Sequence, residues 1–288
     1  MKRRSINVYD VFFIFLAGAL AVIFILPFLS VLAKSLSDEA SVLTGEVKFI
    51  PINFNTSAYR YVLSSNRVYT AFMNSVFVVV VGTIFALFIN CLAAYPIAHR
   101  DFKHRNFFRY FFMFTMIFSA GIIPGYLVVR KLGMLNTYWA LIVPAAAAPY
   151  NLLIIISFMQ EIHPSMDESA RIDGASDFLI FFRIYLPLSK PVLASMSLFF
   201  AVGLWNDYFR PLMFLSSEEK YTMALYLRRV LLSAAEITKN LDTTVYGNVA
   251  AESVQNATIM VATVPILLVY PFMQRYFVTG MSLGAVKG

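Results

Sequence analysis

The feature that most constrains this chain is a series of long apolar runs without a single Asp, Glu, Lys or Arg. Such runs cover 11–33, 68–98, 110–129, 132–160 and 253–274, and a further apolar stretch at 191–215 is interrupted only by Asp207 and Arg210. A helix needs roughly 20 mostly apolar residues to cross about 30 Å of hydrocarbon. The sequence therefore predicts an all-α membrane protein with six transmembrane helices, at approximately 11–33, 70–98, 110–129, 138–160, 191–215 and 253–274.

Composition supports lipid as the solvent of this chain. Of its 288 residues, 59% are hydrophobic and 14% are charged, whereas a soluble domain carries about 25% charged residues. The first apolar run is longer than the roughly 7 to 15 residues of a signal-peptide core, so we interpret it as a retained helix. The sequence shows no internal repeat and no linker, which indicates a single membrane domain over 1–288.

The distribution of basic residues predicts the topology. Clusters at 2–4 and 100–109 fall on one side of the membrane if the helices alternate, and basic loops are typical of the cytoplasmic side. Both termini and the loops 100–109 and 161–190 are then cytoplasmic, while 34–67 and 216–252 are external. The first external segment is either a plain loop or a loop that leads into an amphipathic surface helix. The net charge of +7 forms no basic stripe with interleaved aromatic residues, which argues against nucleic-acid binding.

The chain carries no recognisable catalytic, metal or nucleotide motif. Cys91 is its only cysteine and its three histidines are dispersed, so neither an internal disulfide nor a metal site is expected. The phosphate-binding pattern G-x-x-x-x-G-K-[S/T] does not occur in the sequence. We therefore expect a non-enzymatic protein without a bound cofactor.

The predicted cytoplasmic loop 161–190 is the most informative part of the chain. Ser165 and Glu168 have the spacing of a capping box, which predicts a short helix from about 166 to 173. Gly174 is the expected stop of this helix. Ala170 and Gly174 are four residues apart, so a partner could approach a common face that bears almost no side chain. Ser176 is expected to cap a second helix over 177–185.

This loop resembles the signature of permease subunits of binding-protein-dependent ABC importers. The pattern E-x-A, three residues, G, nine residues, I-x-L-P falls on Glu168, Ala170, Gly174, Ile184, Leu186 and Pro187, with Ser169 in place of the usual alanine. The resemblance implies a coupling helix that inserts into a groove on a separate ATPase subunit, which holds the ATP and Mg. The residues that it assigns to ATPase coupling are Glu168, Ser169, Ala170, Asp173, Gly174, Ile184, Leu186 and Pro187.

A second segment offers groups suited to a sugar at the outer part of the bilayer. Trp205, Asn206, Asp207 and Tyr208 supply aromatic rings, an amide and a carboxylate, and Asp207 can pair with Arg210 at the i, i+3 spacing. The alternative is an interfacial aromatic belt with Asp207 as a packing group. The segment is similar to the W-N-[D/E]-[F/Y] pattern of carbohydrate-uptake permeases, in particular the maltose-type second permease subunit and its oligosaccharide-transporting relatives.

The resemblance also implies the assembly and its location. It predicts a second homologous permease subunit, two ATPase subunits and an extracytoplasmic solute-binding protein, in a bacterial cell membrane. The end of the chain resembles the same group, which implies a second ATPase contact at Gly284 and Lys287. The expected function is ATP-driven import of a sugar or oligosaccharide by alternating access. Another polar solute remains open, and an ion-coupled secondary transporter is less favoured because inverted repeats and midplane acids are missing from the sequence.

Overall fold

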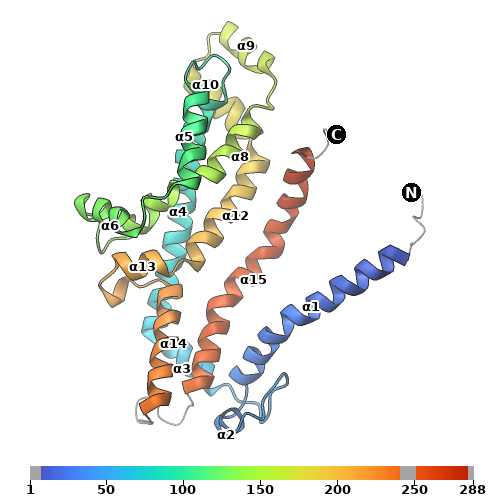
Figure 1. Cartoon of the computed structure of the whole chain (residues 1–288), viewed down its shortest axis with the longest axis vertical. Helices are drawn as coiled ribbons and strands as arrows, with labels where there is room; N and C mark the ends of the chain where they lie inside the picture. Colours follow the sequence, from blue (N-terminus) through green and yellow to red (C-terminus); the bar gives the residue numbers. More distant parts are fainter. Residues whose placement is uncertain (1–7, 241–250, 285–288) are drawn as a thin grey trace. The chain divides into compact units, whose positions relative to one another are not determined.

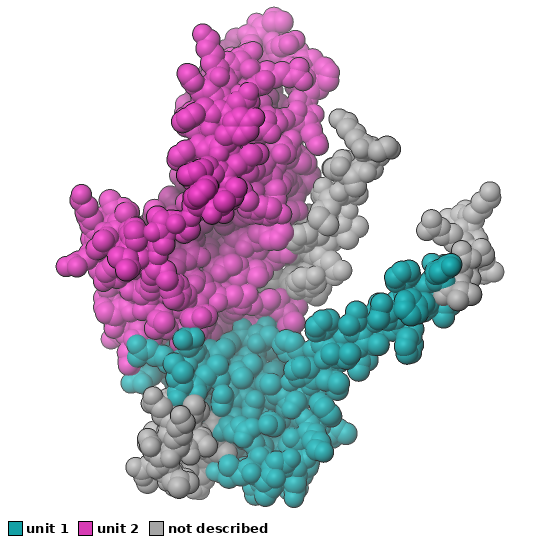
Figure 2. All heavy atoms as spheres, viewed as in Figure 1, with its two compact units in different colours: residues 1–69, 227–264 teal, residues 70–226, 265–288 magenta. Residues whose placement is uncertain are grey.

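The computed structural model describes residues 8–240 and 251–284, which form helices and connecting loops without a strand. The chain divides into two compact units, which Figure 2 distinguishes by colour. Unit 1 comprises 1–69 and 227–264, and unit 2 comprises 70–226 and 265–288. Each unit is described below by itself.

Unit 1 begins with the long apolar helix α1 (Val8–Ser35), which matches the first predicted span. None of its most apolar 18-residue stretch is buried within the protein. Helix α1 exposes large side chains such as Phe13, Phe15 and Phe24 along its length. An apolar surface of this extent is stable in lipid or against a partner, and not in water.

The segment after α1 folds against the end of that helix. It contains the short helices α2 (Glu39–Leu43) and α3 (Ser57–Ser64). Ala33, Val42 and Val47 form a small buried core. Helix α3 buries Ala58 and Val62 on one side and exposes Arg60 and Ser64 on the other. Of the two alternatives for 34–67, the structure therefore shows a loop that leads into a helix.

A polar contact ties the last turn of α1 to the final helix, α15 (Ala251–Gly284). Lys34 Nζ donates a 2.7 Å hydrogen bond to Glu252 Oε1 in the first turn of α15. Close by, the hydroxyl groups of Ser35 and Tyr59 lie 2.8 Å apart. These contacts hold the end of α1 against α3 and the start of α15.

In unit 2, the helices α4 (Asn66–Ala98), α5 (Arg105–Ile117), α8 (Pro149–Met159) and α12 (Lys190–Asn206) lie side by side (Figure 1). Small residues of α4, among them Ala86 and Ala94, are completely buried at this junction. Small side chains let helix backbones approach closely, which is the usual basis of helix association in lipid. The core that results holds the loop 161–190 at one end of the unit.

Three predicted spans are broken rather than continuous. The span predicted at 110–129 consists of α5 and α6 (Ile122–Lys131), whose axes differ by 117°, so a single straight helix there is wrong. The chain turns at Gly121, whose φ of +85° lies in the left-handed region that glycine tolerates. Apolar composition predicted the membrane environment but not this turn.

The other two breaks lie near prolines and polar residues. The span predicted at 138–160 consists of α7 (Trp139–Ala146) and α8, which differ by 48° and meet just before Pro149. The stretch at 191–215 divides into α12 and α13 (Phe209–Phe214). The described chain continues through the 3₁₀ turn Glu218–Lys220 into α14 (Met223–Asn240).

In the described part of the chain, α1 and α4 are each long and apolar enough to cross a membrane as single helices. Three bent helix pairs can each be counted as one crossing, namely α5 with α6, α7 with α8, and the helical run 177–188 with α12, which raises the number to five. The stretch 252–268 within α15 adds a shorter apolar helix.

Candidate functional site

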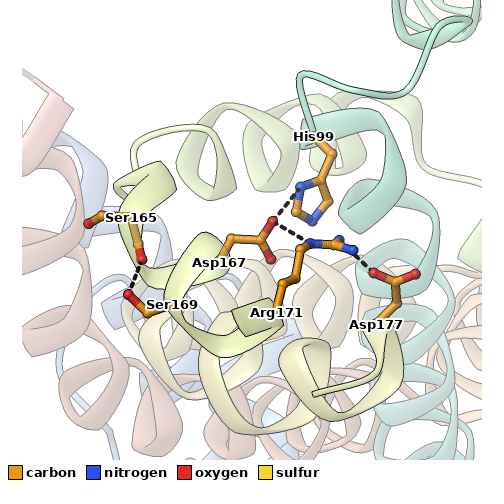
Figure 3. Close-up of polar contacts among 6 residues, drawn as sticks. All are labelled: His99, Ser165, Asp167, Ser169, Arg171 and Asp177. Atoms are coloured by element: carbon orange, nitrogen blue, oxygen red, sulfur yellow. Dashed lines mark hydrogen bonds and ion pairs between the residues drawn. The ribbon is translucent and has the colours of Figure 1, made fainter. Parts of the chain in front are cut away.

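The loop 161–190 places a short helix, α9 (Pro164–Ile172), at one end of unit 2 (Figure 1). Its N-cap is His163, whose Nδ1 atom accepts a hydrogen bond from the Ser165 amide at 3.2 Å. The predicted capping box of Ser165 and Glu168 is therefore wrong. Pro164 determines the start, because proline suits the first helical position, where its missing N–H costs nothing. Ser165 lies inside the first turn, where its carbonyl accepts from Ser169 Oγ at 2.7 Å (Figure 3).

The predicted C-terminal stop of α9 is confirmed. Gly174 has a φ of +80°. Its amide donates to the Arg171 carbonyl at 3.0 Å, and the Ala175 amide donates to the Ala170 carbonyl at 2.9 Å. This pair of hydrogen bonds is the Schellman motif, in which a left-handed residue closes the last helical turn.

The second predicted helix of the loop is also confirmed, with one irregularity. Ser176 Oγ accepts from the Leu179 amide at 3.4 Å and caps α10 (Asp177–Ile180). The chain continues through the π-helical turn η1 (Phe181–Tyr185) and α11 (Leu186–Leu188). Pro187 does not end this helical run, which turns by 78° into α12 at Ser189.

A buried carboxylate anchors α9 to its neighbours. Asp167 is 8% exposed, and its Oδ2 atom accepts from Arg171 Nε at 3.1 Å. The same oxygen lies 3.7 Å from Nδ1 of His99, which directly follows α4. Arg171 Nη2 in turn donates to Asp177 Oδ1 at 2.6 Å (Figure 3). The hydrogen bond that Arg171 donates to the Asp167 side chain raises the pKa of Arg171, and the charged guanidinium holds both carboxylates.

Aromatic rings enclose the His99 end of this network. The imidazole of His99 lies 4.5 Å from the ring of Tyr95 and 5.1 Å from that of Tyr185, measured between centroids. Tyr95 also makes an edge contact with Phe181. Burial raises the pKa of the Tyr185 phenol. The C-terminal end of α4, helix α9 and the π-helical turn therefore meet in one packed cluster.

The sequence analysis did not identify His99, Asp167, Arg171 and Asp177 as members of this site. Part of the signal was available, because Asp167 and Arg171 have the i, i+4 spacing that favours an ion pair on a helix. The contact with His99 joins residues far apart in the sequence and required the tertiary structure.

The residues predicted to couple to an ATPase divide into two sets. Glu168, Ser169, Asp173, Gly174 and Pro187 are exposed, whereas Ala170, Ile184 and Leu186 pack against the core of unit 2. The expected common face of Ala170 and Gly174 is therefore wrong. Ala170 points inward, while a Cβ atom added at Gly174 would meet nothing within 4 Å.

Helix α9 presents an apolar side chain to its surroundings that sequence reasoning missed. Ile172 is 85% exposed, more than any other large hydrophobic residue that the structure describes. Met166 on the same helix is also exposed. Ile172 therefore offers an apolar contact on an otherwise polar helix.

A cavity of about 440 Å³ lies beside α9. Arg100, Arg105 and Arg109 of the predicted cytoplasmic loop line it together with Asp167 and Glu168 of α9. The basic loop and the buried carboxylate thus share one polar region next to the exposed face of the helix.

The predicted substrate segment forms the break between α12 and α13. Asp207 Oδ1 accepts from the amides of Phe209 and Arg210 at 3.0 and 3.2 Å, which starts α13. Its Oδ2 atom lies 2.5 Å from Arg210 Nε, so the predicted pair is confirmed. Arg210 also donates to the Leu141 carbonyl of α7 at 3.4 Å. Both charged side chains therefore hold the backbone in place at this break.

The remaining residues of the predicted substrate segment have different environments. The ring of Trp205 makes an edge contact with Phe72 at 5.8 Å and lines an apolar groove. Asn206 and Tyr208 are exposed. At the end of the chain, Gly284 is the last residue of α15, and Lys287 lies outside the described residues.

Comparisons with known proteins agree with this architecture. Residues 67–283 match the family described as binding-protein-dependent transport system inner membrane component. Protein LplC of Bacillus subtilis is 43% identical over 287 residues, which cover 100% of this chain and 97% of LplC. The polygalacturonan/rhamnogalacturonan transport system permease protein YtcP of the same organism is 41% identical over 269 residues, which cover 93% of this chain and 94% of YtcP.

A solved structure extends the similarity to the fold. A chain in the crystal structure of a bacterial ABC transporter involved in the import of the acidic polysaccharide alginate aligns with a TM-score of 0.86 and 31% identity. The alignment covers 96% of this chain and 99% of that one. On these matches, the chain belongs to the family of inner membrane components of binding-protein-dependent transport systems.

Proposed function

We propose that this chain is the permease subunit of an ATP-driven importer that takes up a sugar or oligosaccharide delivered by an extracytoplasmic binding protein. The observation that carries the proposal is the near-complete alignment with a chain of the alginate importer. Named relatives point to the same substrate class, including YtcP and the arabinooligosaccharides transport system permease protein AraQ of Halalkalibacterium halodurans. Import then follows alternating access in a bacterial cell membrane.

The proposed topology has six crossings in a single membrane domain with both termini in the cytoplasm. The crossings correspond to α1, α4, the pair α5 and α6, the pair α7 and α8, the pair α12 and α13, and α15. Helix α9 is then cytoplasmic, beside the basic loop 100–109. Support comes from the helix lengths and from the arginines around the cavity next to α9.

In this proposal, α9 is the coupling helix and docks in a groove on one of two ATPase subunits, which hold ATP and Mg. Glu168, Ser169, Asp173 and Gly174 face the ATPase, with Ile172 as an apolar anchor. Ala170, Ile184 and Leu186 hold the loop on the membrane helices, and the exposed Pro187 belongs to the same docking loop, 161–190. A second, homologous permease subunit completes the membrane part, and Gly284 and Lys287 form a second ATPase contact.

The proposed sugar path includes the exposed Asn206 and Tyr208. Trp205 contributes the ring beside them, while Asp207 and Arg210 fix the local backbone. An amide and an aromatic ring suit a neutral, hydroxyl-rich ligand, because the amide bonds hydroxyls and the ring packs on C–H groups. A polar solute other than a sugar is the alternative.

The decisive experiment reconstitutes the chain in vesicles with its companion permease, ATPases and binding protein. ATP hydrolysis and uptake are measured with labelled oligosaccharides, among them uronate-containing, arabinose-based and glucose-based chains, and with amino acids as non-sugar controls. We expect uptake that requires ATP, and ATP hydrolysis stimulated by the binding protein with one class of oligosaccharide. Uptake driven by a proton or sodium gradient without ATP would contradict the proposal. Import of an amino acid in place of the oligosaccharides would show that the substrate is not a sugar.

A further inference from the structure

The geometry points to Asp167 and His99 as positioning residues that pass the displacement of α9 directly to α4. We infer that their contact forms a mechanical link between the coupling helix and the end of that long helix. The inference rests on the proposed coupling role of α9 and names the route by which movement enters the membrane part.

Asp167 stands out by its environment. Among the residues whose side-chain burial the structure describes, 9–232 and 252–268, it is the only Asp, Glu, Lys or Arg that is buried. Burying a carboxylate is costly unless it is paired and hydrogen-bonded. A carboxylate on an independent surface helix would remain in water. The burial of Asp167 therefore favours a role in holding α9 against other elements.

The partners of Asp167 come from different elements. Arg171 lies one turn further along α9 and connects the carboxylate to Asp177 at the start of α10. His99 follows the last residue of α4 and is fixed between the rings of Tyr95 and Tyr185. A push on α9 therefore reaches α4 through His99 and reaches the run from α10 to α12 through Arg171.

The link is incompletely closed in this structure. The distance of 3.7 Å from His99 Nδ1 to Asp167 Oδ2 exceeds that of a hydrogen bond. Two further buried atoms, Asp167 Oδ1 and His99 Nε2, have no hydrogen-bond partner within the described residues. An approach of α9 by less than about 1 Å would bring the pair within hydrogen-bond distance. Docking of the ATPase on the exposed face of α9 would supply that approach.

The test measures sugar imported per ATP hydrolysed in the reconstituted complex, with Asp167→Ala, His99→Ala and the double variant. We expect each to lower this ratio by about 2- to 30-fold, the usual range for residues that carry coupling. The double variant should be no worse than Asp167→Ala, because that variant already removes the contact with His99. Asp167→Asn, which keeps an acceptor oxygen for His99 and Arg171, should restore most of the ratio.

Glu161→Ala and His104→Ala are the matched controls, because both residues are exposed in the same two loops. They should leave the ratio unchanged. A merely structural role predicts less assembled complex with a normal ratio, and that result overturns the link. If the complex with Asp167→Ala does not assemble, His99→Ala and Asp167→Asn test the link. The link then requires a lower ratio with His99→Ala and a nearly normal ratio with Asp167→Asn. Failure of the wild-type complex to couple ATP to sugar uptake would instead overturn the proposed function.

Discussion

The side-chain amide of Asn90 in α4 donates a 2.9 Å hydrogen bond to the carbonyl oxygen of Ala146, the residue at which α7 ends. The same amide donates to the Ala86 carbonyl at 2.7 Å. The break before Pro149 frees carbonyls at the end of α7, and the hydrocarbon offers them no water. A buried polar side chain on a neighbouring helix therefore stabilises a bend within the membrane part.

We predict that Asn90→Ala destabilises the protein by about 1–3 kcal/mol, because it removes two buried hydrogen bonds, one of which joins α4 to the end of α7. Thermal unfolding of the purified complex in detergent should show a lower Tm. Asn106→Ala, at an exposed position at the start of α5, is the control and should leave the Tm unchanged. An unaltered Tm in Asn90→Ala would show that the bend does not depend on this amide.

Ile172→Ser should weaken the association of the chain with its ATPase while leaving its own stability unchanged. The side chain is 85% exposed, so the folded chain loses little packing. An apolar anchor in an interface contributes more than about 1 kcal/mol, which corresponds to at least about fivefold weaker binding. Titration of the ATPase onto the purified membrane part measures this affinity. Ile50→Ser, at a side chain that is 77% exposed in the predicted external loop, should have no effect.

Substitutions at Gly174 separate backbone strain from steric bulk. Its φ of +80° penalises any L side chain by about 1–2 kcal/mol. Gly174→Ala should therefore keep most of the stimulated ATP hydrolysis, whereas Gly174→Arg should abolish it because the long side chain blocks docking. Gly133→Ala is the control for backbone strain, because Gly133 has a φ of +69° and open space around it but lies outside the docking loop. Any loss of ATP hydrolysis in this variant reflects strain and not docking. Equal loss of hydrolysis in both Gly174 variants would assign the effect to the backbone and not to docking.

The break between α12 and α13 should respond differently to two substitutions. Arg210→Ala leaves the carboxylate of Asp207, which is 14% exposed, without its cationic partner, and should lower the stability by about 1–3 kcal/mol. Asn206→Ala removes an exposed amide and should leave the Tm unchanged while it lowers the uptake rate. Tm and uptake are measured on the same reconstituted samples. Normal uptake with Asn206→Ala would remove this residue from the sugar path.

The sequence alone predicted several features that depend on local chemistry, although its capping box at Ser165 and Glu168 was wrong. Apolar runs identified α1 and α4, and the left-handed stop at Gly174 and the cap at Ser176 followed from the residue types. The pair of Asp207 and Arg210 followed from i, i+3 spacing, which brings two side chains together without help from the rest of the fold.

Only the tertiary structure decided how these elements bend and which faces they bury. Composition is equally apolar on both sides of Gly121, so hydropathy could not reveal the turn of 117° between α5 and α6. Ala170 is small enough for either face of α9, and its inward position depends on the neighbouring helices. His99 meets Asp167 because α4, α9 and η1 converge at one end of unit 2. Contacts between residues distant in the sequence arise from the packing of whole helices, which residue spacing does not encode.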